Sequence, residues 1–186
     1  QPPAPTEPVE IHPIELAGRT PADKLADVSA ALEKQGADAC ILTEPEAIAW
    51  TFNIRGHDLP HLPVALSFAI LHRDGKADLF IDAAKLSNEV VTHLEPHAAI
   101  HAPDTFQAKL HGLGASQKTA LLNPVRAASA IAHLITAGGG KLIEGPDPTE
   151  RLKAVKNEAE REGARAAHRR DGVAMIRFLA WLDREA

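Results

Sequence analysis

Residues 64–81 read VALSFAILHRDGKADLFI, two apolar runs separated by a polar tetrapeptide. Asp74 and Gly75 lie at the centre of that tetrapeptide, and an Asp-Gly pair between two apolar runs is a strong signal for a tight turn between antiparallel strands. We therefore expect strands over residues 64–71 and 77–81, joined as a β-hairpin.

Helices and strands alternate on both sides of this hairpin. Thr20 and Pro21 favour the start of a helix, and Gly36 favours its end. By the same signals and by hydrophobic spacing, we expect helices over residues 21–35, 44–51, 83–93, 105–113 and 125–137, and strands over residues 37–42, 98–101, 119–122 and 141–143. The order predicts an α/β fold, a mixed β-sheet with helices on both faces.

The two ends of the chain differ from this pattern. Residues 1–13, QPPAPTEPVEIHP, contain five prolines and predict an extended linker. Residues 14–146 then form the α/β domain. Residues 147–186 predict one long helix, continuous from Glu150, that would begin a further domain.

That C-terminal helix is most apolar where the chain ends. Asp147 can cap its start, and Phe178, Trp181 and Leu182 recur in its last turns. Because these large side chains have no later segment to cover them, we expect them to fray or to pack against another copy of the chain.

Composition limits the classes of protein that this chain can be. With 186 residues, 45% hydrophobic residues and a net charge of −5, it has a core but no general attraction for nucleic acid or an anionic membrane. Cys40 is the only cysteine, which excludes an intramolecular disulfide and fits a reducing compartment, so we expect a cytoplasmic protein. A secreted mature protein is the alternative, because the first residue is Gln and not Met. No apolar run is long enough to span a bilayer.

The most irregular loop carries the candidate chemistry. Residues 53–63 read NIRGHDLPHLP. Arg55 offers a planar guanidinium that can bind a carboxylate, and Gly56 beside it allows close backbone approach. An intramolecular ion pair is the alternative for Arg55. His57, Asp58 and His61 could hold a metal ion, but the prolines argue against a helical pair of histidines and no fourth ligand is near.

Other candidate motifs do not assemble a site. Gly138–Lys141 is not a phosphate-binding loop, because Leu142 stands where serine or threonine is required. His168 and Asp171 are three residues apart on a helix, where surface polar groups are common. Cys40 lies in an apolar strand and is expected to be inert. We therefore expect no catalytic residue and no metal ligand in this chain.

Two sets of residues nevertheless resemble one family. The first is Thr43-Glu44-Pro45-Glu46-Ala47-Ile48-Ala49-Trp50, followed by Asn53-Ile54-Arg55-Gly56, Pro63 and Leu79-Phe80-Ile81-Asp82. The second is Ala154-Val155-Lys156-Asn157, Glu160, Gly163, Ala167-His168, Asp171-Gly172-Val173-Ala174, Phe178 and Trp181-Leu182. The first set resembles the second domain of aminopeptidase P, and the second set resembles the helix that opens its catalytic domain.

This resemblance implies a fold and a function. The family consists of three-domain metallopeptidases that remove an N-terminal residue preceding proline, using two divalent metal ions, typically Mn²⁺, in a pita-bread catalytic domain. The fold implied for residues 14–146 is the creatinase/prolidase N-terminal domain, with a ribonuclease H-like motif. The metal-ligand motifs of the family lie downstream of the residues matched here.

The resemblance therefore predicts a noncatalytic fragment of an Xaa-Pro aminopeptidase. Its partners would be the catalytic domain of the same polypeptide, peptides with proline at the second position, and a second copy in a homodimer. Arg55 and His61 would bind substrate at the rim of the active site, and the fragment alone would hold no metal and have no activity. The alternative is a stand-alone interaction or ligand-binding module related to this domain.

Overall fold

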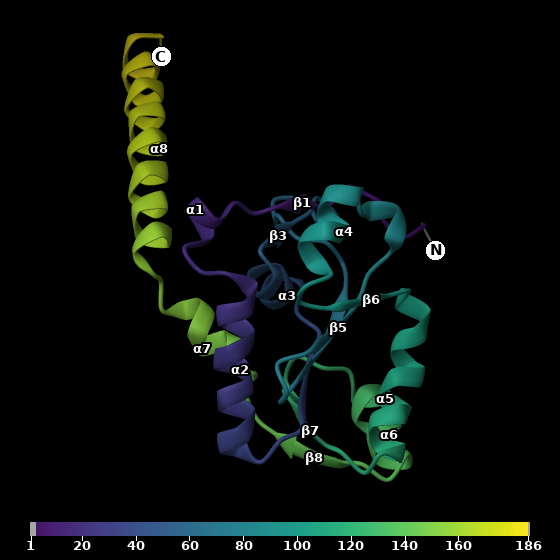
Figure 1. Ribbon diagram of the computed structural model, residues 1–186. Coiled ribbons are helices and arrows are strands. Elements are labelled where there is room, and N and C mark those ends of the chain that lie inside the picture. The colour runs from purple at the N-terminus through teal and green to yellow at the C-terminus, as the bar shows by residue number, and fades with distance from the viewer. Residues whose placement is uncertain (1–2, 186) are drawn as a thin grey trace.

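A mixed six-stranded sheet forms the centre of the protein in the computed structural model, which describes residues 3–185 (Figure 1). The strand order is β6-β5-β4-β2-β7-β8. β4 runs antiparallel to both its neighbours, whereas the other paired strands of this sheet are parallel. The strands are β2 (Ala39–Leu42), β4 (Phe68–His72), β5 (Ala77–Phe80), β6 (Ala99–His101), β7 (Thr119–Leu122) and β8 (Lys141–Glu144).

The described part of the chain contains eight α-helices. They are α1 (Ile14–Ala17), α2 (Pro21–Gln35), α3 (Pro45–Phe52), α4 (Asn88–Leu94), α5 (Phe106–Ala115), α6 (Ser129–Ala137), α7 (Pro148–Ala154) and α8 (Glu158–Glu185), with short 3-10 turns η1 (Ala83–Lys85) and η2 (Pro103–Thr105). α2 matches its predicted bounds because Thr20 and Asp23 form a capping box at its start and Gly36 ends it in the left-handed conformation.

Helices cover both faces of the sheet, which confirms the predicted fold class. Cys40 and Leu42 of β2 belong to the hydrophobic core that includes residues of α2, α3 and α4. Ala39 and Ile41 belong to the core formed with α5 and α6. Successive residues of a strand point to opposite faces, so β2 is buried on both sides.

The predicted linker over residues 1–13 is partly wrong. β1 (Glu10–Ile11) pairs antiparallel with β3 (Ile54–Arg55) in a small second sheet. Val9 is buried, and its backbone nitrogen donates to the carbonyl oxygen of Lys85 at 2.9 Å. The proline-rich segment is therefore anchored to the domain by its last residues.

Three other predicted boundaries differ from the structure. β4 begins at Phe68 instead of Val64, and α6 begins at Ser129 instead of Val125. The predicted helix over residues 83–93 is divided into η1 and α4. The division has a local cause, because the Oγ of Ser87 accepts a hydrogen bond from the backbone nitrogen of Val90 and caps α4.

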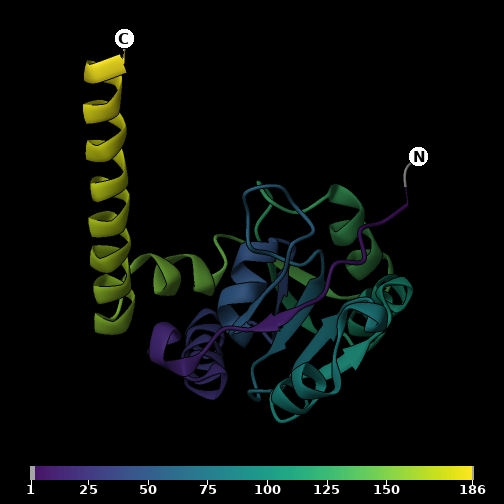
Figure 2. The same cartoon turned by 90° about the horizontal axis from the view of Figure 1, so that it is seen from above.

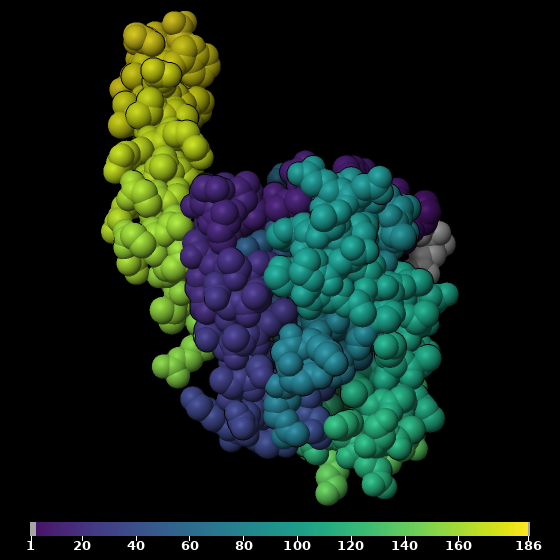
Figure 3. Space-filling model, in the orientation of Figure 1, coloured from purple at the N-terminus to yellow at the C-terminus, as the bar shows by residue number. Residues whose placement is uncertain are grey.

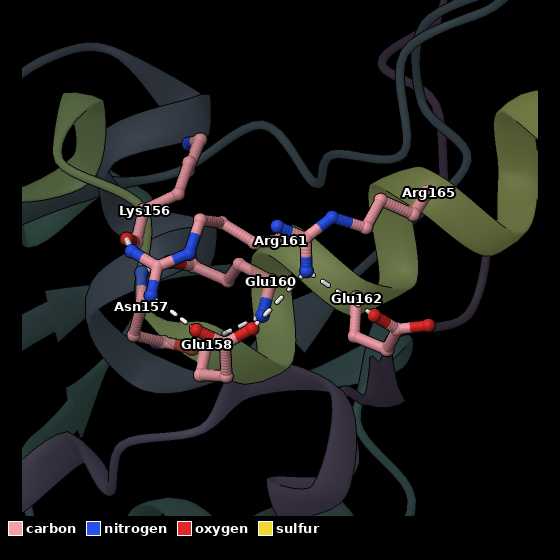
Figure 4. Close-up of polar contacts among 7 residues, drawn as sticks. All are labelled: Lys156, Asn157, Glu158, Glu160, Arg161, Glu162 and Arg165. Atoms are coloured by element: carbon pink, nitrogen blue, oxygen red, sulfur yellow. Dashed lines mark hydrogen bonds and ion pairs between the residues drawn. The ribbon is translucent and has the colours of Figure 1, made fainter.

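The prediction of one continuous helix from Glu150 is also wrong, because the chain forms α7 and then α8. Val155 ends α7 in an extended conformation. The Oδ1 of Asn157 accepts a hydrogen bond from the backbone nitrogen of Glu160 at 3.0 Å, and the Glu160 carboxylate accepts one from the nitrogen of Asn157 at 2.9 Å (Figure 4). This reciprocal pair is a capping box that begins a new helix.

α8 projects away from the rest of the protein as a column, seen in Figures 1 and 2 and as a solid surface in Figure 3. Ion pairs connect Glu158 and Glu162 with Arg161 and Arg165 along its first turns (Figure 4). The helix is continuous to Glu185, so the predicted fraying is not observed in the described residues. Within residues 3–185, no helix is both long and apolar enough to cross a membrane.

Candidate functional site

Asn53, Ile54, Arg55 and Gly56 form a sharp bend after α3, which we call the NIRG corner. Asn53 has a φ of 52° and a ψ of 50°, a left-handed conformation that asparagine tolerates better than most residues. At Gly56, an added Cβ would lie 2.8 Å from the backbone nitrogen of Ala65. Glycine is therefore required where the two ends of the loop meet.

A buried lysine stabilises the NIRG corner through hydrogen bonds. The side chain of Lys24 extends from α2, and the residue is only 2% exposed. Its Nζ donates hydrogen bonds to the carbonyl oxygen of Trp50 at 2.7 Å and to the Oδ1 of Asn53 at 2.5 Å. The same nitrogen lies 4.5 Å from the centre of the Trp50 ring. Burial lowers the pKa of Lys24 to about 8.

Arg55 is half-buried at the C-terminal end of α3. Its Nη1 donates to the carbonyl oxygen of Ile54 at 2.8 Å and reaches that of Ala49 at 3.4 Å. These contacts place the guanidinium at the negative end of the helix dipole. Burial lowers the pKa of Arg55, and Glu160 opposes this effect. No carboxylate among residues 3–185 forms an ion pair with Arg55, so the predicted ability to bind a carboxylate remains.

The first turn of α8 meets this cationic corner. The Nδ2 of Asn157 donates to the carbonyl oxygen of Ala17 at 2.8 Å, which attaches α8 to α1. Burial lowers the pKa of Lys24 and of Arg55, and the negative charge of Glu160 opposes this lowering in both. Burial, then Arg55 and Lys24, lower the pKa of His12. Three positive or ionisable groups, His12, Lys24 and Arg55, therefore lie together where α8 joins the domain.

Raising the pH should stabilise the protein through Lys24. Its pKa in the folded protein, about 8, is below the ordinary lysine value of 10.5, so the unfolded chain binds more protons between these two values. The free energy of unfolding should therefore rise between pH 8 and 10.5 relative to a Lys24→Met variant. When the pKa values of the folded and unfolded states differ by one, the effect on stability is about 1.4 kcal/mol. Urea unfolding of both proteins across this range measures the difference, and parallel pH profiles would contradict it.

Gly18 is predicted to control the attachment of α8. It has a φ of 68°, and an added Cβ would overlap the side chain of Asn157. We expect Gly18→Ala to destabilise the fold and to accelerate amide exchange in the first turn of α8. Gly75→Ala is the matched control, because Gly75 has a φ of 82° but open space around it. The control should carry only the backbone strain of about 1–2 kcal/mol, and equal exchange in the two variants would refute the contact.

The structure does not bring His57, Asp58 and His61 together. His57 and His61 are exposed, and the Nε2 of His57 lies 3.8 Å from the Glu10 carboxylate. Asp58 turns inward instead. Among residues 3–185, no three histidine, cysteine, aspartate or glutamate side chains form a group that could hold a metal ion. His57, Asp58 and His61 are therefore not placed to share one ion in this structure, and His168 and Asp171 are exposed residues of α8.

Asp58 instead anchors the loop through a buried ion pair with Lys85. The Nζ of Lys85 lies 2.5 Å from the Oδ2 of Asp58, and their side chains are 4% and 0% exposed. The same Oδ2 accepts a hydrogen bond from the backbone nitrogen of Leu66 at 2.6 Å. These contacts fix the base of the loop, at whose tip His61 adopts a positive φ of 66°. No hydrogen bond within the described residues joins His61 to Arg55.

The fold and the corner define an α/β domain built on a mixed sheet and followed by a separate C-terminal helix. Residues 1–160 match the family model described as the creatinase/prolidase N-terminal domain. The chain belongs to this family.

Similar proteins extend well beyond this domain. The chain is 39% identical to a probable Xaa-Pro aminopeptidase P of Talaromyces stipitatus, covering 100% of this chain and 29% of that protein. It is 36% identical to a probable Xaa-Pro aminopeptidase P of Paracoccidioides brasiliensis, covering 97% and 31%. The chain thus spans less than a third of the length of these relatives.

A solved structure is also similar over nearly the whole chain and is also much longer than it. An X-prolyl aminopeptidase from Caenorhabditis elegans, described as a cytosolic enzyme with a di-nuclear active site, superposes with a TM-score of 0.90 at 28% identity, over 99% of this chain and 30% of that one. An Xaa-Pro dipeptidase from Bacillus anthracis is 11% identical, with a TM-score of 0.55, and shares the fold. The predicted resemblance to the aminopeptidase P family is confirmed.

Proposed function

We propose that this chain is the noncatalytic domain, followed by the first helix of the catalytic domain, of an enzyme that removes an N-terminal residue preceding proline. The support is the high structural similarity to the Caenorhabditis elegans enzyme over 99% of the chain, α8 included. Under this proposal, residues 14–146 are the middle domain and residues 147–186 lead into the catalytic domain.

The observation that carries the proposal is the apolar surface of α8. Exposed apolar side chains occupy residues 173, 175, 176, 178, 179, 181 and 182, from Leu182 at 42% to Ile176 at 68% exposure. At about 3.6 residues per turn, these positions surround the helix. A helix that is apolar all round is suited to the interior of a larger structure. The catalytic domain would supply that interior.

The NIRG corner would face the same junction. Arg55 has donors beyond the backbone contacts of its Nη1 and lies near the first turn of α8, so it is placed to bind a carboxylate of the peptide substrate or of the catalytic domain. His61 would contact substrate from the exposed tip of the loop. These roles make the domain part of the rim of the active site.

The metal centre would lie outside this chain. The described residues do not fit a two-metal site, since no cluster of ligands is present among them. We propose that the complete enzyme holds two divalent ions, Mn²⁺ in the first instance, that it forms a homodimer, and that it works in the cytoplasm. The chain itself would position and cover the substrate.

The coding sequence after Ala186 tests this proposal. We expect the reading frame to continue and to encode the aspartate, histidine and glutamate ligands of a two-metal centre. A stop codon directly after Ala186 would overturn the proposal and favour a stand-alone interaction module. The purified chain should also be inactive, and release of an N-terminal residue from an Xaa-Pro peptide by the chain alone with Mn²⁺ would contradict the assignment.

A further inference from the structure

A cavity of about 580 Å³ lies between the β4–β5 hairpin and α5, the helix beside the sheet in Figure 1. Ile70 and Leu113 contribute apolar surface to it, and Ala108 and Gly112 leave space along the α5 side. None of its lining residues belongs to the NIRG corner or to α8. The cavity is therefore separate from the site proposed above.

Two of the aspartates that line the cavity, Asp78 and Asp38, are less exposed than its cations. The Asp78 side chain is 14% exposed and contacts three donors: the Nε2 of His72 at 2.9 Å, the Nε2 of His101 at 2.5 Å and the Nζ of Lys109 at 3.2 Å. Burial raises the pKa of Asp78, but these hydrogen bonds outweigh it and hold the pKa well below its usual value. Asp78 is thus ionised, and its two oxygens accept from three donors.

Asp38 repeats this arrangement on the other side of the cavity. Its side chain is 23% exposed, and its Oδ1 lies 2.9 Å from the Nη2 of Arg73 and 3.9 Å from the Nζ of Lys118. The Oδ2 accepts a hydrogen bond from the backbone nitrogen of Thr119 at 2.9 Å. The two more buried carboxylates therefore hold the cations in place.

Three cations line the more exposed part of the cavity and come from three different segments of the chain. The side chains of Arg73, Lys109 and Lys118 are 47%, 45% and 50% exposed. Each has a single carboxylate partner among the described residues. An ammonium group has three donors and a guanidinium five, so each cation retains donors for a ligand. The third acid in the lining, Asp74, is 59% exposed and pairs with Lys76 at 3.6 Å, on the turn of the hairpin.

We propose that this cavity is a binding site for a small organic anion, one with carboxylate or phosphate groups on a short aliphatic frame. The acidic groups would bind Arg73, Lys109 and Lys118, and the aliphatic part would lie against Ile70 and Leu113. Convergent cations above an apolar floor, oriented by the partly buried carboxylates of Asp38 and Asp78, are the feature that supports this class of ligand.

Titration of the full chain with citrate and with inorganic phosphate, at constant ionic strength, tests the proposal. Amide NMR signals of Gly112, Ser116 and Thr119 should shift saturably, with a dissociation constant on the order of 1 mM for the better probe. Saturation by phosphate but not by citrate would identify a phosphate site, and the reverse a carboxylate site. Absence of saturable shifts with both probes would overturn the proposal.

Matched variants show whether the cations bind the probe. Lys118→Gln should weaken binding about tenfold, the loss of one charge-assisted contact. Lys76→Gln removes a lysine of the β4–β5 hairpin that is 83% exposed and outside the lining, so it should leave affinity within about twofold. If Lys118→Gln binds as tightly as Lys76→Gln, while both retain the wild-type spectrum elsewhere, the assignment is wrong.

Discussion

Lys85→Met should cost about 3–5 kcal/mol of folding free energy, because it leaves a buried carboxylate without its cation. The Asp58 side chain is 0% exposed, and its Oδ1 has no hydrogen-bond partner among the described residues. Within residues 3–185, Lys85 therefore supplies the only ionic contact of a carboxylate whose side chain is not exposed to water. A domain of ordinary stability, about 5–15 kcal/mol, would lose a large part of it. Urea unfolding of the variant and the wild type measures the loss.

Two further variants separate the buried charge from the loss of a lysine. Adding Asp58→Asn to Lys85→Met removes the unpaired charge while an amide oxygen can still accept from Leu66, so part of the lost stability should return. Lys76→Met is the surface control: its 3.6 Å pair with Asp74 is exposed and should contribute less than about 1 kcal/mol. A cost for Lys85→Met equal to that of Lys76→Met would refute the buried ion pair.

The consequence for the proposed function is local. The loop that begins at the NIRG corner returns to β4 beside Leu66, whose backbone nitrogen donates to Asp58. Without Lys85, the segment around Leu66 should become mobile before the rest of the domain. The loop tip that carries His61 should become mobile with it. In the complete enzyme, we expect the Michaelis constant for an Xaa-Pro peptide to rise more than the turnover number falls.

The elements of the fold could be predicted from the sequence where a residue pattern has only one physical interpretation. Asp74 and Gly75 make the hairpin, and Thr20 with Gly36 bounds α2. Asn157 and Glu160 carried an equally clear capping box, which would have divided α7 from α8. The apolar spacing on both sides concealed it, and the predicted continuous helix was wrong for that reason.

The buried lysines explain why the site was harder to predict. Lys24 precedes Val28 and Leu32 by four and eight residues, so its position on the apolar face of α2 could be predicted. Its acceptors, Trp50 and Asn53, are distant in sequence and no spacing reveals them. The same holds for Lys85 and Asp58 and for the group around Asp78, which tertiary packing alone assembles.

Phe80→Ala should also cost about 3–5 kcal/mol, the usual range for removing a fully buried phenylalanine. Phe80 is 0% exposed in β5. Its ring meets that of Phe106 edge to face, with centroids 5.0 Å apart, and stacks with His101 at 5.2 Å. Aromatic pairs contribute beyond the buried area, and the cavity left behind adds to the loss. Thermal and urea unfolding should give the same large destabilisation.

Phe68→Ala is the matched control, because Phe68 also packs on Phe106, with ring centroids 4.5 Å apart, but is 36% exposed. It should cost clearly less, since much of its surface already meets water. Amide exchange gives a second measurement, because Phe106 begins α5. Loss of the Phe80 ring should accelerate exchange in α5 more than in α2, which lies on the other face of the sheet. Equal acceleration in both helices would mean that Phe80 supports the fold as a whole and not the α5 side, where Lys109 helps to line the anion cavity.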